Sequence, residues 1–264
     1  MPLESSHLAW SPVVTLGEDR NSRWLIICDH ATNRVPDSIN GGTLGIASED
    51  MARHIAYDPG AAGVSIALAD RLQAPVVLSN FSRLIIDPNR GEDDPTLIMR
   101  LYDGTIIPAN RHIDEDETQR RLQLCYRPYH DAVERMARRQ DDTVIISIHS
   151  FTPQFRHRPP RPWHIGLLYA DDERLSRPLI RLLRDEPGLI VGANQPYSGH
   201  LKGDTIDRHA IAKGRQNTLI ELRNDLIQHD EAQTAWAERL ARLLPLALEQ
   251  AETEGETDGP PNAD

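Results

Sequence analysis

The chain has 264 residues, of which 39% are hydrophobic and 26% charged, and its formal net charge is -11 at pH 7. This length suits one large α/β domain or two small ones, and the apolar residues suffice for a core. The chain is acidic and has no stripe of Lys and Arg interleaved with aromatic residues. Both features argue against a nucleic-acid-binding surface.

Neither the cysteines nor the apolar runs indicate a secreted or membrane-embedded protein. Cys28 and Cys125 form no spacing motif, which argues against a disulfide scaffold or a Cys-based zinc site. The start, MPLESSHLAWSP, lacks the basic and apolar stretches of a signal peptide. No apolar run approaches the roughly 20 residues that span a bilayer. We expect a soluble cytoplasmic protein without a nucleic-acid or membrane partner, and the sequence does not indicate its oligomeric state.

The first predicted elements are a strand and two helices. Residues 23–30 (RWLIICDH) form an apolar run followed by polar residues, which predicts a buried strand. Residues 48–72 have helical spacing. Pro59 and Gly60 divide this stretch into a short helix and a longer one that begins near Asp58.

The middle of the chain predicts strands on either side of a loop and a helix. Residues 74–87 predict one or two strands, and residues 88–112 have the composition of a loop. A charged amphipathic helix is expected over 114–139, with a kink at Pro128. Residues 143–150 (TVIISIHS) predict the next buried strand.

The last third continues the alternation of strand and helix. Residues 164–170 predict a strand and residues 172–185 a helix. Residues 189–214 predict a short strand and a long irregular loop, and such loops are commonly functional. Residues 216–227 predict a strand and residues 230–250 the closing helix.

This alternation predicts an α/β fold, a three-layer sandwich with a mostly parallel, mixed central sheet. We expect a single domain over residues 1–249. An acidic disordered tail is expected over residues 250–264, because that segment has almost no apolar residues.

Polar side chains occur where three of the predicted strands end. Asp29 and His30 follow LIIC, His149 and Ser150 follow IISI, and Glu221 lies in LIELRND. The carboxyl ends of parallel strands meet at one edge of a sheet. Two histidines and a carboxylate there could bind Zn²⁺ and leave one position open for water, with a glutamate as general base. Taken alone, a histidine at a strand end is more often a surface or hydrogen-bonded residue.

Further information lies in seven segments spread along nearly the whole chain. They are CDHATNRVP (28–36), HIAYDPGAAG (54–63), SRLIIDPNR (82–90), IHSFTP (148–153), GLLYADDERLSRPLI (166–180), NQPYSG (194–199) and GDTIDRHAIAKGRQNTLIELRNDLI (203–227). Together, and in this order, they resemble the N-formylglutamate amidohydrolase family. The resemblance implies a hydrolase of linear amide bonds, a deformylase of amino-acid catabolism. Its small-molecule substrate would be an acidic amino acid with an N-formyl or other short N-acyl group, such as N-formyl-L-glutamate.

A more distant resemblance concerns mechanism. ISIHSF (146–151) and IELRND (220–225) are similar to two strands of the zinc carboxypeptidases. This similarity implies a carboxypeptidase-like fold and one zinc ion, with His30 and His149 as metal ligands and Glu221 as general base. The carboxypeptidase pattern has a ligating Glu where this chain has Asn33, and an amide is a poor zinc ligand. We expect Asp58 to be the third ligand, with Asp29 as the alternative, which could instead orient an imidazole.

Arginines with bidentate geometry suit a substrate that carries carboxylates. An arginine near the metal could also stabilise the developing oxyanion, and we assign this role to Arg208. The expected substrate-binding residues are Arg83, Asn89, Arg90, Tyr197 and His209.

Two other functions remain open at this stage. One is hydrolysis of another N-acyl amino acid or small amide on the same scaffold. The other is a non-catalytic binding module on a hydrolase fold, which Asn33 in place of a ligating Glu keeps open.

Overall fold

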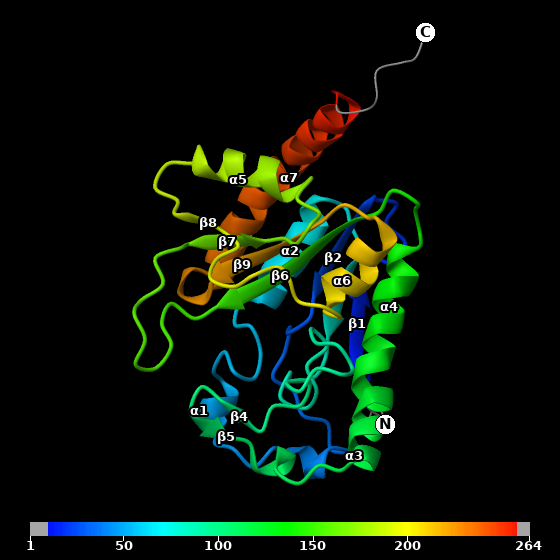
Figure 1. Cartoon of the computed structure of the whole chain (residues 1–264), viewed down its shortest axis with the longest axis vertical. Helices are drawn as coiled ribbons and strands as arrows, with labels where there is room; N and C mark the ends of the chain where they lie inside the picture. The colour runs from blue at the N-terminus through cyan, green and yellow to red at the C-terminus, as the bar shows by residue number, and fades with distance from the viewer. Residues whose placement is uncertain (1–9, 258–264) are drawn as a thin grey trace, which may run out of the picture.

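The centre of the structure is a seven-stranded mixed sheet (Figure 1). The structure is a computed structural model that describes residues 10–257. In their order across the sheet, the strands are β1 (Val13–Leu16), β3 (Val76–Ser79), β2 (Trp24–Cys28), β6 (Val144–Phe151), β9 (Asn217–Arg223), β7 (Ile165–Leu168) and β8 (Val191–Ala193).

Most neighbouring strands are parallel, as expected. Strand β1 is antiparallel to β3, and β7 is antiparallel to β9. The pairs β2–β3, β2–β6, β6–β9 and β7–β8 are parallel. The carboxyl ends of β2, β6 and β9 therefore point the same way in the middle of the sheet.

Helices cover both faces of the sheet, which confirms the three-layer α/β architecture. Along β2, Trp24 and Ile26 pack into one core, and Leu25 and Ile27 pack into the other. Successive side chains of a strand point to opposite faces, so a strand buried on both sides is apolar throughout. The first core is covered by α2 (Ala61–Arg71), α5 (Ser176–Arg184) and α7 (Asp230–Thr257), and the second by α4 (Arg127–Ala137) and α6 (Thr205–His209).

Smaller elements complete the molecule, and α1, β4, β5 and α3 lie together at one end of it (Figure 1). The helices are α1 (Ser48–Met51) and α3 (Glu115–Arg121), and β4 (Leu101–Tyr102) pairs with β5 (Thr105–Ile106). Single 3₁₀ turns span Asn40–Gly42, Pro108–Asn110, Ile211–Lys213 and Asn224–Leu226.

The turn before α2 shifts the start of that helix from the expected Asp58 to Ala61. Gly60 adopts φ 83° there, in the left-handed region that favours glycine. A β-carbon at this position would lie 2.3 Å from the Ile227 carbonyl oxygen. The turn therefore needs a glycine, and it places Asp58 ahead of the helix.

The long helix expected over 114–139 is divided into α3 and α4. A π-helical segment, Leu122–Tyr126, joins them. The irregularity lies just before Pro128 rather than at it. Proline has no N–H to donate to the preceding turn, and a π-turn accommodates the missing hydrogen bond.

Other boundaries also differ from expectation. Residues 80–87 form no second strand, and the edge strand β1 and the short α6 were not foreseen. Helix α7 continues past residue 249 to Thr257, so the tail expected from residue 250 begins as helix, while residues 258–264 lie outside the described part of the chain. Within residues 10–257, no helix has both the length and the apolarity needed to cross a membrane.

Candidate metal centre and substrate cavity

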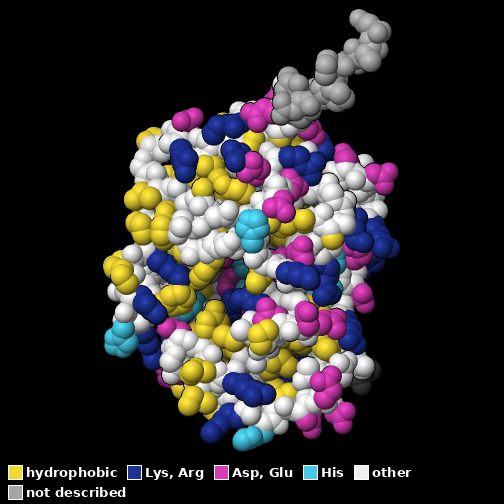
Figure 2. All heavy atoms as spheres, viewed as in Figure 1, with side chains coloured by type: hydrophobic (Ala, Val, Ile, Leu, Met, Phe, Trp, Pro, Cys, Tyr) yellow, Lys and Arg dark blue, Asp and Glu magenta, His cyan; other side chains and the backbone are white. Residues whose placement is uncertain are grey.

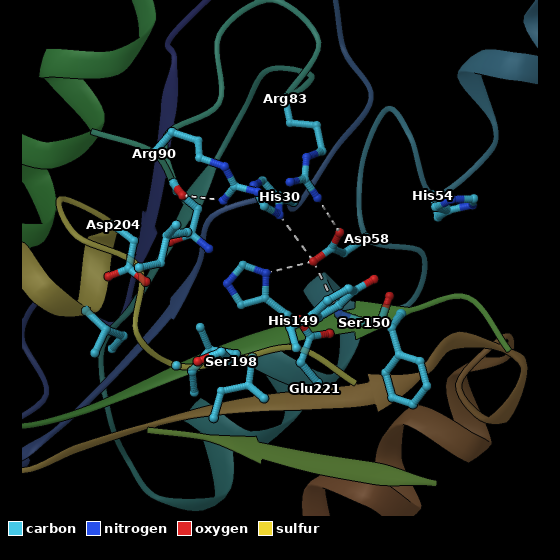
Figure 3. A pocket seen from close by; sticks show the side chains of 18 of the residues that line it. His30, His54, Asp58, Arg83, Arg90, His149, Ser150, Ser198, Asp204 and Glu221 are labelled. Atoms are coloured by element: carbon cyan, nitrogen blue, oxygen red, sulfur yellow. Dashed lines mark hydrogen bonds and ion pairs between the residues drawn. The ribbon is translucent and has the colours of Figure 1, made fainter. Parts of the chain in front are cut away.

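Three side chains with metal-binding groups converge above the carboxyl ends of the central strands (Figure 3). His30 follows β2, Asp58 precedes α2 and His149 lies in β6. One potential ligand atom from each of the three lies within 4.8 Å of the others, and all three residues are buried. Asp58 Oδ2 is 2.8 Å from His149 Nδ1 and 3.3 Å from His30 Nδ1. The Asp58 backbone N–H also donates to the His30 carbonyl, at 2.9 Å.

A second carboxylate contacts the far nitrogen of each imidazole. His30 Nε2 is 2.7 Å from Asp87 Oδ1, and His149 Nε2 is 3.0 Å from Asp29 Oδ2. Both Nδ1 atoms consequently face Asp58. Such outer carboxylates fix the tautomer and orientation of metal-binding histidines.

Asp29 lies behind His149 in a saturated hydrogen-bond network. Its Oδ1 accepts hydrogen bonds from the Tyr129 and Thr205 hydroxyls, both at 2.8 Å. Burial opposes its charge, but the hydrogen bond and charge of His149 outweigh burial and lower the pKa of Asp29 to about 2. Asn33 is engaged elsewhere, because its amide donates to the Met51 carbonyl at 2.8 Å. Of the three residues considered for the third ligand position, Asp58 is the one in the cluster.

The charge of this cluster fits a divalent cation. Arg83 contacts Asp87 Oδ2 at 2.7 Å and Asp58 Oδ1 at 3.5 Å. With neutral histidines, Asp29, Asp58 and Asp87 carry three negative charges, of which Arg83 compensates one. Buried charges are stable only when they are compensated. The remaining two negative charges and the His/Asp/His donor set suit Zn²⁺.

The acids around His149 favour its positively charged form. Burial lowers the pKa of His149, but its hydrogen bonds to Asp29 and Asp58 outweigh burial and raise the pKa well above the usual value. Burial likewise opposes the charge of Asp58, and the two histidines lower its pKa. Asp58 thus stays ionised beside an imidazole that its charge stabilises in the cationic form, which is the electrostatic environment that a bound cation needs.

Glu221 stands beside the cluster on the neighbouring strand. Residues His149 of β6 and Glu221 of β9 are register partners. Glu221 Oε2 is a buried atom without a hydrogen-bond partner among the described residues. Burial, the largest influence, raises the pKa of Glu221 to about 7. Its unsatisfied oxygen and raised pKa suit a group that exchanges protons.

The cluster and Glu221 lie at the base of a cavity of about 310 Å³. Figure 2 shows a hollow in this face of the molecule, with acidic, basic and histidine side chains around it. Its lining includes Arg90, Asn89, Tyr197 and Asp204. Figure 3 shows Arg90 and Asp204 on one side of the cavity and Glu221 and Ser150 on the other.

Comparison with known proteins identifies the family. The family model for N-formylglutamate amidohydrolase matches residues 22–228. The chain belongs to the N-formylglutamate amidohydrolase family. A curated N-formylglutamate deformylase from Pseudomonas putida is 26% identical over 249 residues, which cover 86% of this chain and 89% of that protein.

Solved structures agree with this assignment. A gene product of Agrobacterium tumefaciens is 34% identical with a TM-score of 0.86, and the match covers 92% of this chain and 97% of that one. N-formylglutamate amidohydrolase from Ralstonia eutropha JMP134 shares the fold, with 22% identity, a TM-score of 0.70, and coverage of 94% and 100%. The family resemblance noted in the sequence is confirmed, and the chain is a hydrolase of C–N amide bonds.

The N-formylglutamate amidohydrolase fold places two of the expected site residues outside the cavity lining. The Arg208 guanidinium donates to the Tyr126 hydroxyl at 2.9 Å. His209 contacts His130 at 2.9 Å and Glu134 at 3.0 Å, and it is absent from the cavity lining. Both residues lie in α6, whose helical turn was not foreseen, and the turn directs them away from the cavity. The oxyanion role expected of Arg208 and the substrate contact expected of His209 therefore do not match their positions.

Two acids of the site were not predicted from the sequence: Asp87, which contacts His30, and Asp204, which lines the cavity. Both lie within the segments that carry the family resemblance, so a signal was present. Neither residue ends a strand, however, so the pattern of polar residues at strand ends does not include them. Arg83, expected to bind substrate, lines the cavity but pairs with Asp87 and Asp58.

Proposed function

We propose that this chain is a zinc-dependent amidohydrolase that removes an N-formyl or another short N-acyl group from an amino acid. The observation that carries the proposal is the convergence of two histidine Nδ1 atoms on Asp58, with Glu221 in register beside one of them. Membership of the N-formylglutamate amidohydrolase family makes N-formyl-L-glutamate the reference substrate.

His30, Asp58 and His149 would hold the metal. With three protein ligands, the ion would keep one position for water, as catalytic zinc sites do. When bound, the ion would lower the pKa of a water molecule and polarise the amide carbonyl. Asp29 and Asp87 would keep the Nε2 protons of the two imidazoles in place, so that both Nδ1 atoms remain available as ligands.

Glu221 would act as the general base. Its Oε2 has no competing hydrogen bond among the described residues and can accept a proton from the attacking water. The same carboxyl group would then return the proton to the leaving amine nitrogen. A group whose pKa lies near the operating pH performs both transfers well, and burial raises the pKa of Glu221 to about 7.

Arg90 and Asn89 would bind the substrate carboxylate. Arg90 donates to the Asn89 carbonyl at 2.7 Å and to the Thr96 hydroxyl at 3.1 Å, and it forms no ion pair among the described residues. An arginine without an ionic partner at a cavity wall suits a carboxylate ligand. Tyr197 lines the cavity and would contact the acyl amino acid. Arg161 donates to the Tyr197 hydroxyl at 3.0 Å and holds the ring in place.

The test combines metal analysis with activity. We expect about one zinc ion per wild-type chain, with release of formate from N-formyl-L-glutamate or another N-formyl amino acid. The His149→Ala variant should lose both, whereas Asn33→Ala, the matched control, should keep both. Absence of zinc from the wild type after incubation with the ion would contradict the proposal.

A further inference from the structure

Two buried histidines outside the cavity lining belong to a continuous chain of polar contacts. His130 Nδ1 is 2.9 Å from His209 Nε2. The other nitrogen of His130, Nε2, is 3.0 Å from the Pro88 carbonyl oxygen. The other nitrogen of His209, Nδ1, is 3.0 Å from Glu134 Oε2. The proposed chemistry uses neither imidazole, so the purpose of this buried chain is unexplained by the metal centre.

The chain has three contacts, whereas two neutral imidazoles supply two protons. It ends on a carbonyl oxygen and on a carboxylate, which only accept hydrogen bonds, and a neutral imidazole has one N–H. All three contacts are hydrogen bonds only when the pair holds a third proton. His209 then donates to both Glu134 and His130. The proton of His130 stays on Nε2 and serves the Pro88 carbonyl.

Without the third proton, the contact with Pro88 is the one that weakens. A bare nitrogen beside the Glu134 carboxylate would be repelled, so His209 keeps its proton on Nδ1 and its Nε2 becomes an acceptor. His130 then has one proton for two acceptors, which are His209 Nε2 and the Pro88 oxygen. Its hydrogen bond to the Pro88 carbonyl is present for only part of the time.

The Pro88 carbonyl is coupled to the cavity wall through the chain itself. Pro88 directly precedes Asn89 and Arg90, the proposed carboxylate-binding residues of the lining. Among the described residues, the other recorded donor to this carbonyl is the Thr205 hydroxyl, at 3.3 Å. That hydroxyl has one proton and lies closer to Asp29 Oδ1, at 2.8 Å. Because the peptide group is planar, a released carbonyl would let the following residue rotate with it.

Several charges determine where the third proton resides and when it leaves. Burial, and then the charges of Arg208 and His209, lower the pKa of His130 to about 3, so the third proton belongs to His209. Burial lowers the pKa of His209 as well, although the hydrogen bond and charge of Glu134 oppose this effect. The third proton therefore leaves as pH rises through a value below the usual range of histidine. The charged groups around the pair are Asp29, Glu134, Arg138, Arg208 and Arg215.

We propose that His130 is a positioning residue, which donates to the Pro88 carbonyl and thereby holds Arg90 in the orientation that binds the substrate carboxylate. Glu134 and His209 support it, because together they stabilise the third proton that frees the His130 proton for Pro88. This inference rests on the proposed amidohydrolase function, in which Arg90 binds a carboxylate, and deepens it. The hydrogen bond acts on substrate binding and not on the metal centre, so its loss should raise KM and leave kcat almost unchanged.

The test compares two variants that each keep one nitrogen position of His130. His130→Gln places an amide N–H near the position of Nε2, where it can donate to Pro88 without a shared proton. His130→Asn reaches only the position of Nδ1 and loses that donor. With N-formyl-L-glutamate and the zinc-loaded enzymes, KM should be about 3- to 10-fold higher in His130→Asn than in His130→Gln, with similar kcat and zinc content.

The wild type should change from one behaviour to the other with pH. Its KM should approach that of His130→Gln near about pH 5 and that of His130→Asn near about pH 8, because the third proton leaves in between. Titrations of the metal centre and of Glu221 are common to all three proteins and cancel in the ratios of KM. Glu134→Gln removes the charge that stabilises the third proton, so it should raise KM about 3- to 10-fold near about pH 5. Asp131→Asn, an exposed acid on the same helix, is the matched control and should keep the wild-type profile.

Other outcomes separate the inference from the proposed function. Equal KM values in His130→Gln and His130→Asn would overturn the inference and leave the hydrolase function intact, because His130 would then only fill space. A fall in kcat at unchanged KM would also overturn it. If the His130 variants did not fold, an unchanged KM profile in Glu134→Gln would overturn it instead. Failure of the zinc-loaded wild type to cleave any N-formyl amino acid would overturn the proposed function and the inference together.

Discussion

His149 and Glu221 are register partners on the adjacent parallel strands β6 and β9. Register partners on neighbouring strands project to the same face of the sheet, so the pairing fixes the carboxyl group beside the imidazole. The backbone hydrogen bonds of two central strands therefore hold the proposed base and a proposed metal ligand together. Sites built on strands in this way are more rigid than sites built on loops.

This pairing leads to a prediction for Glu221→Gln. The variant should bind zinc as the wild type does, because Glu221 is outside the His30, Asp58 and His149 group. Its kcat should fall by on the order of 10²–10⁴, the usual contribution of general acid–base catalysis. Metal content and formate release, measured on the same preparation, would test the unchanged zinc binding and the lower kcat. Turnover near the wild-type level would exclude Glu221 as the base.

Asp87 should raise the zinc affinity of the site although it is not one of the proposed metal ligands. Asp87→Asn removes the charge that faces His30 Nε2, and zinc affinity should weaken about 10- to 100-fold. Competition with a chromophoric chelator would measure the change. Asp94→Asn is the matched control, because the Asp94 side chain accepts hydrogen bonds from the Thr96 backbone N–H and hydroxyl and does not line the cavity. Equal affinities in the two variants would show that the outer carboxylate has no influence on the metal.

Arg90 and Arg208 should differ in their effects on substrate binding. Arg90→Ala should raise KM about 10- to 100-fold, since a charge-assisted hydrogen bond contributes about 1.5–3 kcal/mol. Arg208→Ala should alter kcat and KM only slightly, because Arg208 contacts Tyr126 and lies outside the cavity lining. Steady-state kinetics of both variants would test this pair. A larger loss of kcat in Arg208→Ala would restore the oxyanion role first assigned to it.

Much of the fold followed from local patterns in the sequence. The apolar runs that became β2, β6 and β9 are buried on both faces, and such strands are recognisable from composition. Edge strand β1 was missed because its burial alternates, and its four residues carry little signal. Helix α6 was missed because five residues, capped by Asp204, are too few for a helical period.

The sequence by itself determined the residues at the ends of the central strands. His30, His149 and Glu221 follow or close apolar runs, and parallel strands bring such positions to one edge. The Pro59-Gly60 pair also indicated the break before α2, the turn that places Asp58.

Only the tertiary structure decided which loop residues join these strand ends. It placed Asp58 between the histidines and Asp29 behind one of them. It paired Arg83 with acids and left Arg90 without an ionic partner, close to Asp204. The physical reason is that strand ends are positioned by a regular ladder of backbone hydrogen bonds. Loop side chains are positioned by contacts between segments far apart in the chain, which no local pattern encodes.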